Sequence, residues 1–324
     1  MGFLDKLLFP FEWFVASILT GFEWLLTQVG MSDTNGWTWV LSIVGLVLVL
    51  RILLIPLFVR QIKSQRRMQM IQPELMKLQQ KYKGKKDEAS RKAQSEEMFA
   101  LYRHHGTNPF SSCLPILVQM PFFFALFRML NTVPQVAEGT RAARGFFTQD
   151  LAQKMDQATI FGTQLSTTFL HDNDPTAKIL AVVLIISMSA TTFITQHQLM
   201  RKNMPAAALE NNPMAQQQKI MLYALPLIFA VTGVNFPIGV LIYWTVTNLW
   251  TMGQQFYVIR NMPAPGSEAE KRLQERRLAK GKPVTSVQLT TEKETAVQPA
   301  RPSGQRVQPT GKKRGKKNNR PKGR

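Results

Sequence analysis

The chain has 324 residues, is 45% hydrophobic, and carries a formal net charge of +20. Its single cysteine, Cys113, excludes an internal disulfide and a thiolate metal cluster. Charged residues are nearly absent from several long apolar runs and concentrate between and after them, so the sequence predicts an all-α, polytopic membrane protein rather than soluble domains. The basic excess favours an anionic partner, either nucleic acid or lipid headgroups.

The N-terminal segment, residues 1–36, begins with a stretch rich in Phe, Leu and Trp. Polar or small residues recur there at helical spacing and form one face: Asp5, Glu12, Ala16, Thr20, Glu23 and Thr27. Apolar residues lie roughly opposite: Leu4, Leu8, Phe11, Val15, Ile18, Phe22 and Leu25. This pattern favours an amphipathic helix in the plane of the membrane interface, with a sixth span or a signal peptide as the alternatives.

Residues 37–260 contain five segments that are predicted to cross the membrane, each near the ~20 residues that the hydrocarbon requires. They are about 37–59, 109–130, 176–196, 219–234 and 237–258. The fourth segment is short, and only Asn235 and Phe236 separate it from the fifth. The last two segments are therefore expected to form a tight hairpin, in thinned membrane where necessary.

Between the first two spans, residues 62–105 are predicted to form a helical hairpin that stands in water. Its apolar residues alternate three and four positions apart, which is typical of paired helices: Met68, Ile71, Leu75, Leu78 and Tyr82. Gly84 can end the first helix and Asp87 can cap the second. The remaining residues of both helices are mainly Lys, Arg, Gln and Glu.

The charges of the loops predict the orientation. Residues 60–108 hold twelve lysines and arginines, whereas residues 131–175 hold three, against five acidic residues. By the positive-inside rule the first loop is cytosolic and the second, 131–175, is an external loop without an assigned role. The sequence thus predicts a multi-pass protein of the cell (plasma or inner) membrane, with its N-terminus outside and its C-terminus in the cytosol.

Residues 261–324 are predicted to be a basic and largely disordered cytosolic tail after a short charged helix near Glu268–Lys280, because they hold too few apolar residues to fold alone. The basic residues expected to contact ribosomal RNA or anionic lipid are Lys312, Lys313, Arg314, Lys316 and Lys317. A solvated tail that only enforces topology is the alternative.

Arg51 is the one charge deep inside the first predicted span, with eight residues between it and Arg60. That spacing places it ~13 Å from the cytosolic end of the helix. No Asp or Glu occurs in the five predicted spans, so its expected partners are water, backbone carbonyls and the polar side chains of Gln119, Gln196 and Asn248. Arg51 then either snorkels to the headgroups or lines a water-filled cavity open to the cytosol.

Signatures of enzymes are missing from the sequence: it has no Walker loop, no GxGxxG and no HExxH. Its four histidines lie at span ends or in loops rather than inside the spans. We therefore expect no enzymatic activity, no cofactor and no metal site.

Three strings resemble the YidC/Oxa/Alb family of membrane-protein insertases: RILLIPLFVRQIKSQRRMQMIQPELMKLQQKYK, EEMFALYRHHGTNPFSSCLPILVQMPFFFALFRML and FPIGVLIYWTVTNLWTMGQQ. The resemblance covers residues 37–260 and implies the shorter, five-span form found in bacteria without an outer membrane. It implies that Arg51 is the family's groove arginine, and that Trp244, beside Tyr243, and more weakly Gln196 line the same groove.

The resemblance also implies a function. Nascent membrane proteins would be inserted through a hydrated, positively charged groove, and their apolar segments would slide along two helices. The residues expected on that path are Met120, Phe123, Phe124, Phe127, Leu225 and Phe229. The hairpin and the tail would meet ribosomes or the Sec translocon.

Two other functions remain open on the sequence. An anion transporter or channel would use Arg51 as a selectivity charge and would show saturable flux of a small solute. A scaffold that only tethers ribosomes would tolerate Arg51→Ala but not removal of the tail.

Overall fold

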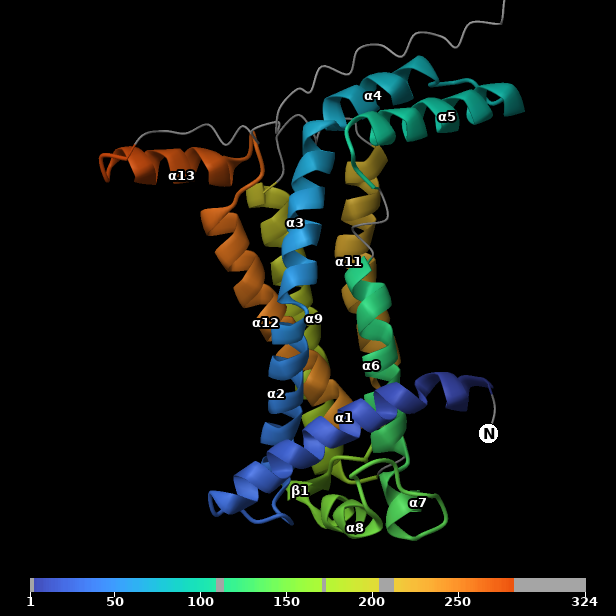
Figure 1. The fold of residues 1–324 in the computed structure, drawn as a ribbon, viewed down its shortest axis with the longest axis vertical. Coiled ribbons are helices and arrows are strands. Elements are labelled where there is room, and N and C mark those ends of the chain that lie inside the picture. Colours follow the sequence, from blue (N-terminus) through green and yellow to red (C-terminus); the bar gives the residue numbers. More distant parts are fainter. Residues whose placement is uncertain (1–2, 109–113, 171–172, 204–212, 283–324) are drawn as a thin grey trace, which may run out of the picture. The chain divides into compact units, whose positions relative to one another are not determined.

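The computed structural model describes residues 3–108, 114–170, 173–203 and 213–282, and these are mostly helical, as the all-α prediction requires. The five basic residues of the predicted tail contact (Lys312, Lys313, Arg314, Lys316 and Lys317) lie outside the described residues. Figure 1 labels the elements. The helices are α1 (Phe3–Gln28), α2 (Gly36–Leu53), α3 (Ile55–Met70), α4 (Gln72–Lys81), α5 (Glu88–His104), α6 (Leu114–Asn131), α7 (Val133–Ala137), α8 (Gln149–Gln157), α9 (Pro175–Asn203), α11 (Pro213–Gly233), α12 (Ile238–Asn261) and α13 (Glu268–Leu278).

Two helices of the described part, α2 and α9, are long and apolar enough to cross a membrane, judged by length and composition. Shorter apolar stretches occupy residues 117–131 of α6 and 222–233 of α11. α12 packs along α9, and α11 packs along α9 as well. Over their described residues the five segments predicted to span are mainly helical, and the first is shared between α2 and α3.

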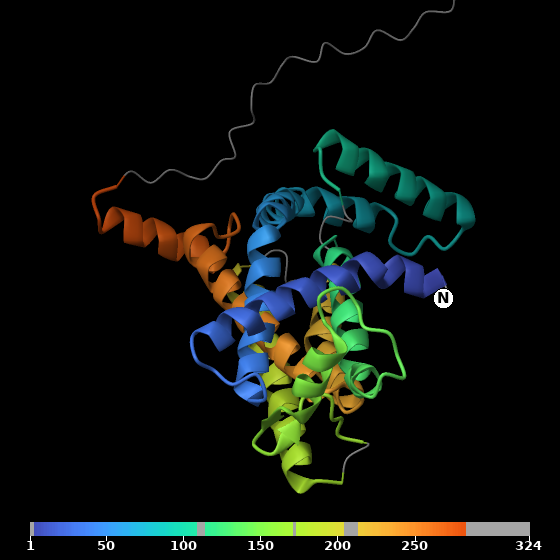
Figure 2. The same ribbon diagram turned by 60° about the horizontal axis from the view of Figure 1, so that its bottom comes forward.

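The main hydrophobic core lies where α1, α2, α6 and α12 meet. α1 crosses α2 and α6, which is visible in Figures 1 and 2. Fully buried side chains from four elements fill this core, among them Leu19, Trp39, Leu46, Leu126 and Leu241. The core thus fixes α1 against the helices that carry the predicted site.

A break at Leu54 divides the first long helical segment. α2 ends at Leu53 and α3 begins at Ile55, one residue before Pro56. Proline has no backbone N–H and is favoured in the first turn of a helix, where that donor would be unpaired in any case, and the new helix begins there. α3 then continues to Met70, beyond the predicted end of the span at residue 59. Pro73 lies in the first turn of α4 for the same reason.

α4 and α5 pack side by side and form what we call the helical pair. Its own small core consists of Ile71, Leu75 and Tyr102, with Met68, Met98 and Leu101 packed against them. Gly84 has a φ of +87° in the connecting turn. The Asp87 side chain accepts a hydrogen bond of 2.8 Å from the Ser90 N–H and caps α5. Both residues thus have the local roles that their types indicated.

Residues 132–170 fold into a small lobe, which we call the cap. It contains α7, α8 and the antiparallel strands β1 (Thr159–Ile160) and β2 (Thr163–Gln164). Two carbonyls of the cap, Thr167 O and Leu165 O, accept hydrogen bonds of 2.9 Å from Ile238 N and Gly239 N. The cap therefore satisfies backbone donors that every helix N-terminus leaves free.

The orientation of α1 differs from the simplest expectation for an interfacial helix, which turns its polar face to water. Glu12, Ala16, Thr20 and Glu23, all from the predicted polar face, are buried against the rest of the chain. Several large apolar side chains of α1 are exposed instead, namely Leu7, Phe9, Trp13, Trp24 and Leu25. Glu12 has basic partners there, Arg128 of α6 and Arg144 of the cap.

Candidate functional site

Arg51 lies in the last turn of α2, and its side chain is turned toward α12. Its Nη2 donates to the Thr251 hydroxyl at 2.9 Å and to the Thr247 carbonyl at 3.3 Å. The guanidinium carbon lies 5.3 Å from the centroid of the Phe58 ring. Only 7% of Arg51 is exposed. The charge is thus held by neutral oxygens and an aromatic face, and a backbone carbonyl is among the partners that the sequence indicated.

α12 can offer these oxygens because three of its polar residues share one face. Tyr243, Thr247 and Thr251 follow at four-residue spacing, so they lie one above another on the helix. The Thr251 hydroxyl also donates to the Thr247 carbonyl at 2.8 Å, which orients its lone pairs toward Arg51. Thr247 and Thr251 were not named from the sequence, although this spacing was the signal that could have identified them.

Tyr243 extends the polar contacts to α6. Its side chain is buried, and its hydroxyl accepts a hydrogen bond from Nε2 of Gln119. Arg51 and Gln119 therefore both contact the same face of α12, from α2 and α6 respectively. The structure brings these three predicted residues together.

Asn248 and Gln196 have other positions. The Asn248 amide donates to the Thr192 hydroxyl at 3.0 Å and to the Met188 carbonyl at 3.3 Å, which joins α12 to α9. Gln196 is half-buried on α9, and within the described residues no hydrogen bond connects it to Arg51 or Tyr243. Among the described residues neither amide forms a hydrogen bond with Arg51.

Trp244 is the centre of an aromatic cluster between three helices. Its ring centroid lies 4.9 Å from that of Phe123 on α6 and 4.6 Å from that of Phe229 on α11. The ring centroid of Phe236, in the turn before α12, lies 5.8 Å from that of Trp244, and Phe236 was not named as a site residue from the sequence. Phe127 contacts both Phe123 and Phe236. Three residues of the predicted substrate path thus pack on or beside Trp244.

The other residues of the predicted path differ in exposure. Met120 and Phe124 are exposed on α6, whereas Leu225 is half-buried on α11. α11 also exposes other large apolar side chains: Tyr223, Leu227, Ile228 and Val231. Both helices therefore present apolar surface beside the aromatic cluster.

A metal site is not indicated by the described residues, because no group of three or more His, Cys, Asp or Glu side chains gathers among them. The chemistry that the Arg51 site offers is hydrogen bonding and positive charge in an apolar setting.

Comparison with known proteins identifies the family. The family model described as 60Kd inner membrane protein matches residues 30–265. A protein of Streptomyces avermitilis named "Membrane protein insertase YidC" is 45% identical over 286 residues, which cover 84% of this chain and 63% of that protein. This chain therefore matches less than two thirds of that relative's length.

A protein of the same name from Tropheryma whipplei (strain Twist) is 39% identical over 324 residues and 97% of both chains. A solved structure entitled "Active YidC insertase crystal structure with the first transmembrane domain resolved" matches with a TM-score of 0.43 and 22% identity, over 79% of this chain and 47% of that one. The family model and the relatives agree with the resemblance of the three sequence strings. This chain belongs to the YidC family, the family of the 60Kd inner membrane protein.

Proposed function

We propose that the chain is a membrane protein insertase of the cell membrane, which assists newly made integral membrane proteins into the bilayer. Relatives with this name match nearly the whole chain. The observation that carries the proposal is the setting of Arg51, a permanent charge inside an apolar helix without a carboxylate partner among the described residues. Placing such a charge in a membrane costs free energy, and charged residues within membrane spans usually serve a function.

The guanidinium of Arg51 is suited to transient binding of a substrate. It has five N–H donors, and the hydrogen bonds within the described residues use only Nη2. Its partners are neutral, so an acidic or polar segment of a nascent protein can replace them without breaking an ion pair. In our proposal this occurs in a hydrated groove open to the cytosol and to lipid, lined by Arg51, Gln119, Tyr243 and Trp244, with Gln196 and Asn248 nearer α9.

The apolar part of the substrate follows α6 and α11. Met120 and Phe124 are exposed on α6, and Leu227 and Ile228 are exposed on α11. Apolar side chains in these positions match the surface of an entering transmembrane helix. Transfer of that helix from water to lipid supplies the driving force, so the step needs no nucleotide.

The proposed topology has five spans, on α2, α6, α9, α11 and α12, with the N-terminus outside and the C-terminus in the cytosol. The charge difference between the two loops supports it. The helical pair and the cap lie at opposite ends of α2 and α3 in Figure 1, as a cytosolic and an external element should. Ribosomes, the Sec translocon and anionic lipids are the partners proposed for the helical pair and the basic tail.

The test is an insertion assay with the purified chain in liposomes. A small single-span protein with a short acidic external tail is translated beside them, and protection of the tail from protease is measured. We expect protection above that of empty liposomes, and a loss of about ten-fold in rate with Arg51→Ala, which corresponds to ~1.4 kcal/mol. Arg60→Ala is the matched control, because Arg60 is an exposed arginine on α3, nine residues further along the chain.

The outcomes separate the competing functions. Protection no better than that of empty liposomes, from a chain shown to be folded, contradicts the insertase function. An equal loss in Arg51→Ala and Arg60→Ala contradicts the special role of Arg51 and leaves general surface charge as the cause. Saturable anion flux without insertion would indicate a channel, and dependence on the tail alone would indicate a ribosome tether.

A further inference from the structure

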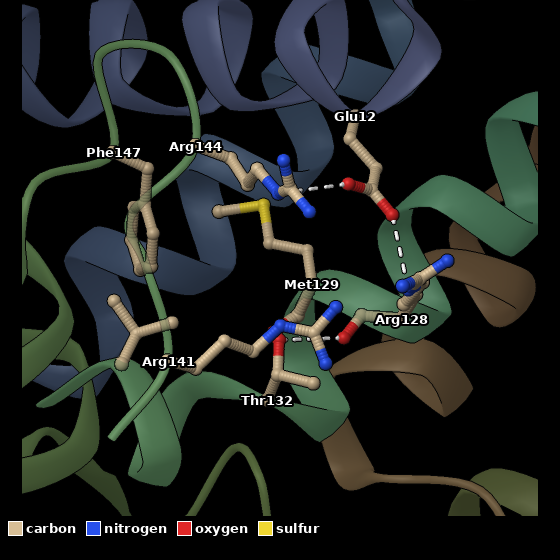
Figure 3. Close-up of a pocket in the computed structure, with 8 residues that line it drawn as sticks. Glu12, Arg128, Met129, Thr132, Arg141, Arg144 and Phe147 are labelled. Carbon is tan, nitrogen blue, oxygen red and sulfur yellow. Dashed lines mark hydrogen bonds and ion pairs between the residues drawn. The ribbon is translucent and has the colours of Figure 1, made fainter. Parts of the chain in front are cut away.

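A small cavity lies where α1, the last turn of α6 and the loop before α8 meet, away from the Arg51 site (Figure 3). Three arginines line it: Arg128 from α6, and Arg141 and Arg144 from the loop. Among the described residues that line it, Glu12 of α1 is the only acidic one. The four side chains carry a net charge of +2 when Glu12 is ionised, which is an excess of positive charge in a partly closed space.

Glu12 anchors two of the arginines. Its Oε1 lies 3.2 Å from Nε of Arg128, and its Oε2 lies 3.5 Å from Nε of Arg144. Glu12 is 4% exposed. Nε of Arg144 and Oε1 of Glu12 are both buried, and neither has a hydrogen-bond partner among the described residues, although each lies within ion-pair distance of an opposite charge. Arg141 also lines the cavity, and Figure 3 shows its guanidinium on the side of Thr132. Nε of Arg144 therefore remains available as a donor, and Arg141 adds a positive charge that forms no ion pair with Glu12.

A phosphate group fits this chemistry. Guanidinium groups bind phosphate oxygens with paired N–H donors, and several arginines around one site are typical of phosphate recognition. The cavity is small, about 20 Å³, which is room for about one water-sized oxygen, so one phosphate oxygen enters it and the rest of the ligand stays at its mouth or outside. The ligand class is thus a phosphate ester whose remainder lies at the surface.

The surroundings of the cavity indicate where that remainder lies. Phe9 and Trp13 of α1 are exposed beside it. The Arg144 guanidinium lies 5.5 Å from the centroid of the Phe9 ring. The ring centroids of Trp13 and the exposed Phe146 are 5.7 Å apart. Exposed aromatic residues on a helix in the interface plane are typical of the boundary between headgroups and acyl chains. The phosphate of a lipid headgroup is in a position to reach the arginines from this side.

We propose that Arg128, Arg141 and Arg144 bind the phosphate of an anionic phospholipid in the outer leaflet, with the exposed apolar side chains of α1 against its acyl chains. The assignment to the outer leaflet rests on the proposed topology. The lipid neutralises the excess charge of the pocket and holds α1 at the membrane surface. This site is separate from the substrate groove and from the basic tail.

The test measures lipid retention by native mass spectrometry. The full chain is reconstituted in vesicles of equal phosphatidylglycerol and phosphatidylcholine, extracted in mild detergent, and its bound lipids are counted. Arg141→Gln is the variant, because the ion pairs of Glu12 to Arg128 and Arg144 remain. Arg103→Gln on α5 is the control, since it removes the same charge from an exposed site elsewhere. Insertion activity is measured separately, so failure of the insertase proposal does not affect this result.

We expect wild type and Arg103→Gln to retain phosphatidylglycerol over phosphatidylcholine, and Arg141→Gln to retain several-fold less phosphatidylglycerol. Arg141→Lys, which keeps the charge but not the paired donors, should recover part of the loss and guards against a folding defect in the glutamine variant. Equal retention in Arg141→Gln and Arg103→Gln overturns the proposal. Displacement of the lipid by inorganic phosphate, measured at constant ionic strength, overturns the assignment to a lipid.

Discussion

The cap and the helical pair α4–α5 are stabilised differently. Side chains of the cap, such as Phe147, Met155 and Leu165, belong to the same hydrophobic core as α1, α2 and α12. The helical pair has a separate core of Ile71, Leu75 and Tyr102. The cap should therefore unfold together with the helix bundle, whereas the helical pair can open alone.

Truncation of one leucine in each region tests this difference most strongly. Leu165→Ala should lower the free energy of unfolding by about 2–5 kcal/mol, because Leu165 is 1% exposed in the shared core. Leu75→Ala, at 4% exposure in the separate core, should leave the main unfolding transition in place and increase hydrogen exchange in α4 and α5 alone. Denaturation in detergent and hydrogen exchange measure the two effects. An equal shift of the main transition in both variants would show one cooperative unit.

A glycine at the contact between α2 and the cap gives the second test. A Cβ on Gly36 would collide with the backbone of Thr159 in β1, so Gly36→Ala should cost about 1–3 kcal/mol. Gly253→Ala on α12 is the control, because nothing lies within 4 Å of the added Cβ. Thermal unfolding of both variants measures the difference. A cap that moves freely on α2 would tolerate Gly36→Ala as well as Gly253→Ala.

Gly84 offers the corresponding test in the helical pair, with a smaller expected effect. Its φ of +87° is unfavourable for residues with a Cβ, so Gly84→Ala should cost about 1–2 kcal/mol within the pair. Asn tolerates this region better, so Gly84→Asn should cost less. Hydrogen exchange of α4 and α5 measures the effect, and the main transition should not move. Equal behaviour of Ala and Asn would show that the turn relaxes to another conformation.

The two regions should also respond to pH with opposite sign. Burial raises the pKa of Glu12, against the opposing effect of Arg144 and Arg141. A raised pKa in the folded state means that Glu12 contributes most stability at and below its ordinary value of 4.5 and loses that contribution as pH rises above it. Compared with Glu12→Gln, the wild type should therefore gain stability as pH falls from 7 toward 4.5.

Glu97 of the helical pair behaves in the reverse way. Hydrogen bonds from Lys81 and Tyr82 lower the pKa of its carboxyl below the ordinary 4.5. Its contribution is therefore present above pH 4.5 and is lost as pH falls below that value. Local hydrogen exchange of wild type and Glu97→Gln should converge in acid and differ at neutral pH. Both pH effects are expected to be the smallest of the series. If the contributions of Glu12 and Glu97 to stability changed with pH in the same direction, that result would contradict the difference in burial between the two carboxyls.

Much of the candidate site could be predicted from residue type and spacing. Arg51 is conspicuous as a charge within an apolar run, and Tyr243 and Trp244 occur in a string that resembles the family. The hydrogen-bond partners of Arg51 could not be predicted in the same way. Thr247 is 196 residues away from Arg51 in the chain and is one of many polar residues on the helices. Gln196 and Asn248 seemed equally suitable, yet only the crossing of α2 and α12 decides which side chains meet Arg51.

The sequence by itself determined the features that depend on neighbouring residues. Helix bounds follow from apolar runs, from Pro56 and Pro73, and from the caps of the short helices, because propensity and capping act within one or two turns. The tertiary structure decided what each helix face meets. The polar face of α1 is buried because Arg128 and Arg144 are brought to Glu12 from more than a hundred residues away, and the pairing of distant charges depends on packing rather than on local pattern.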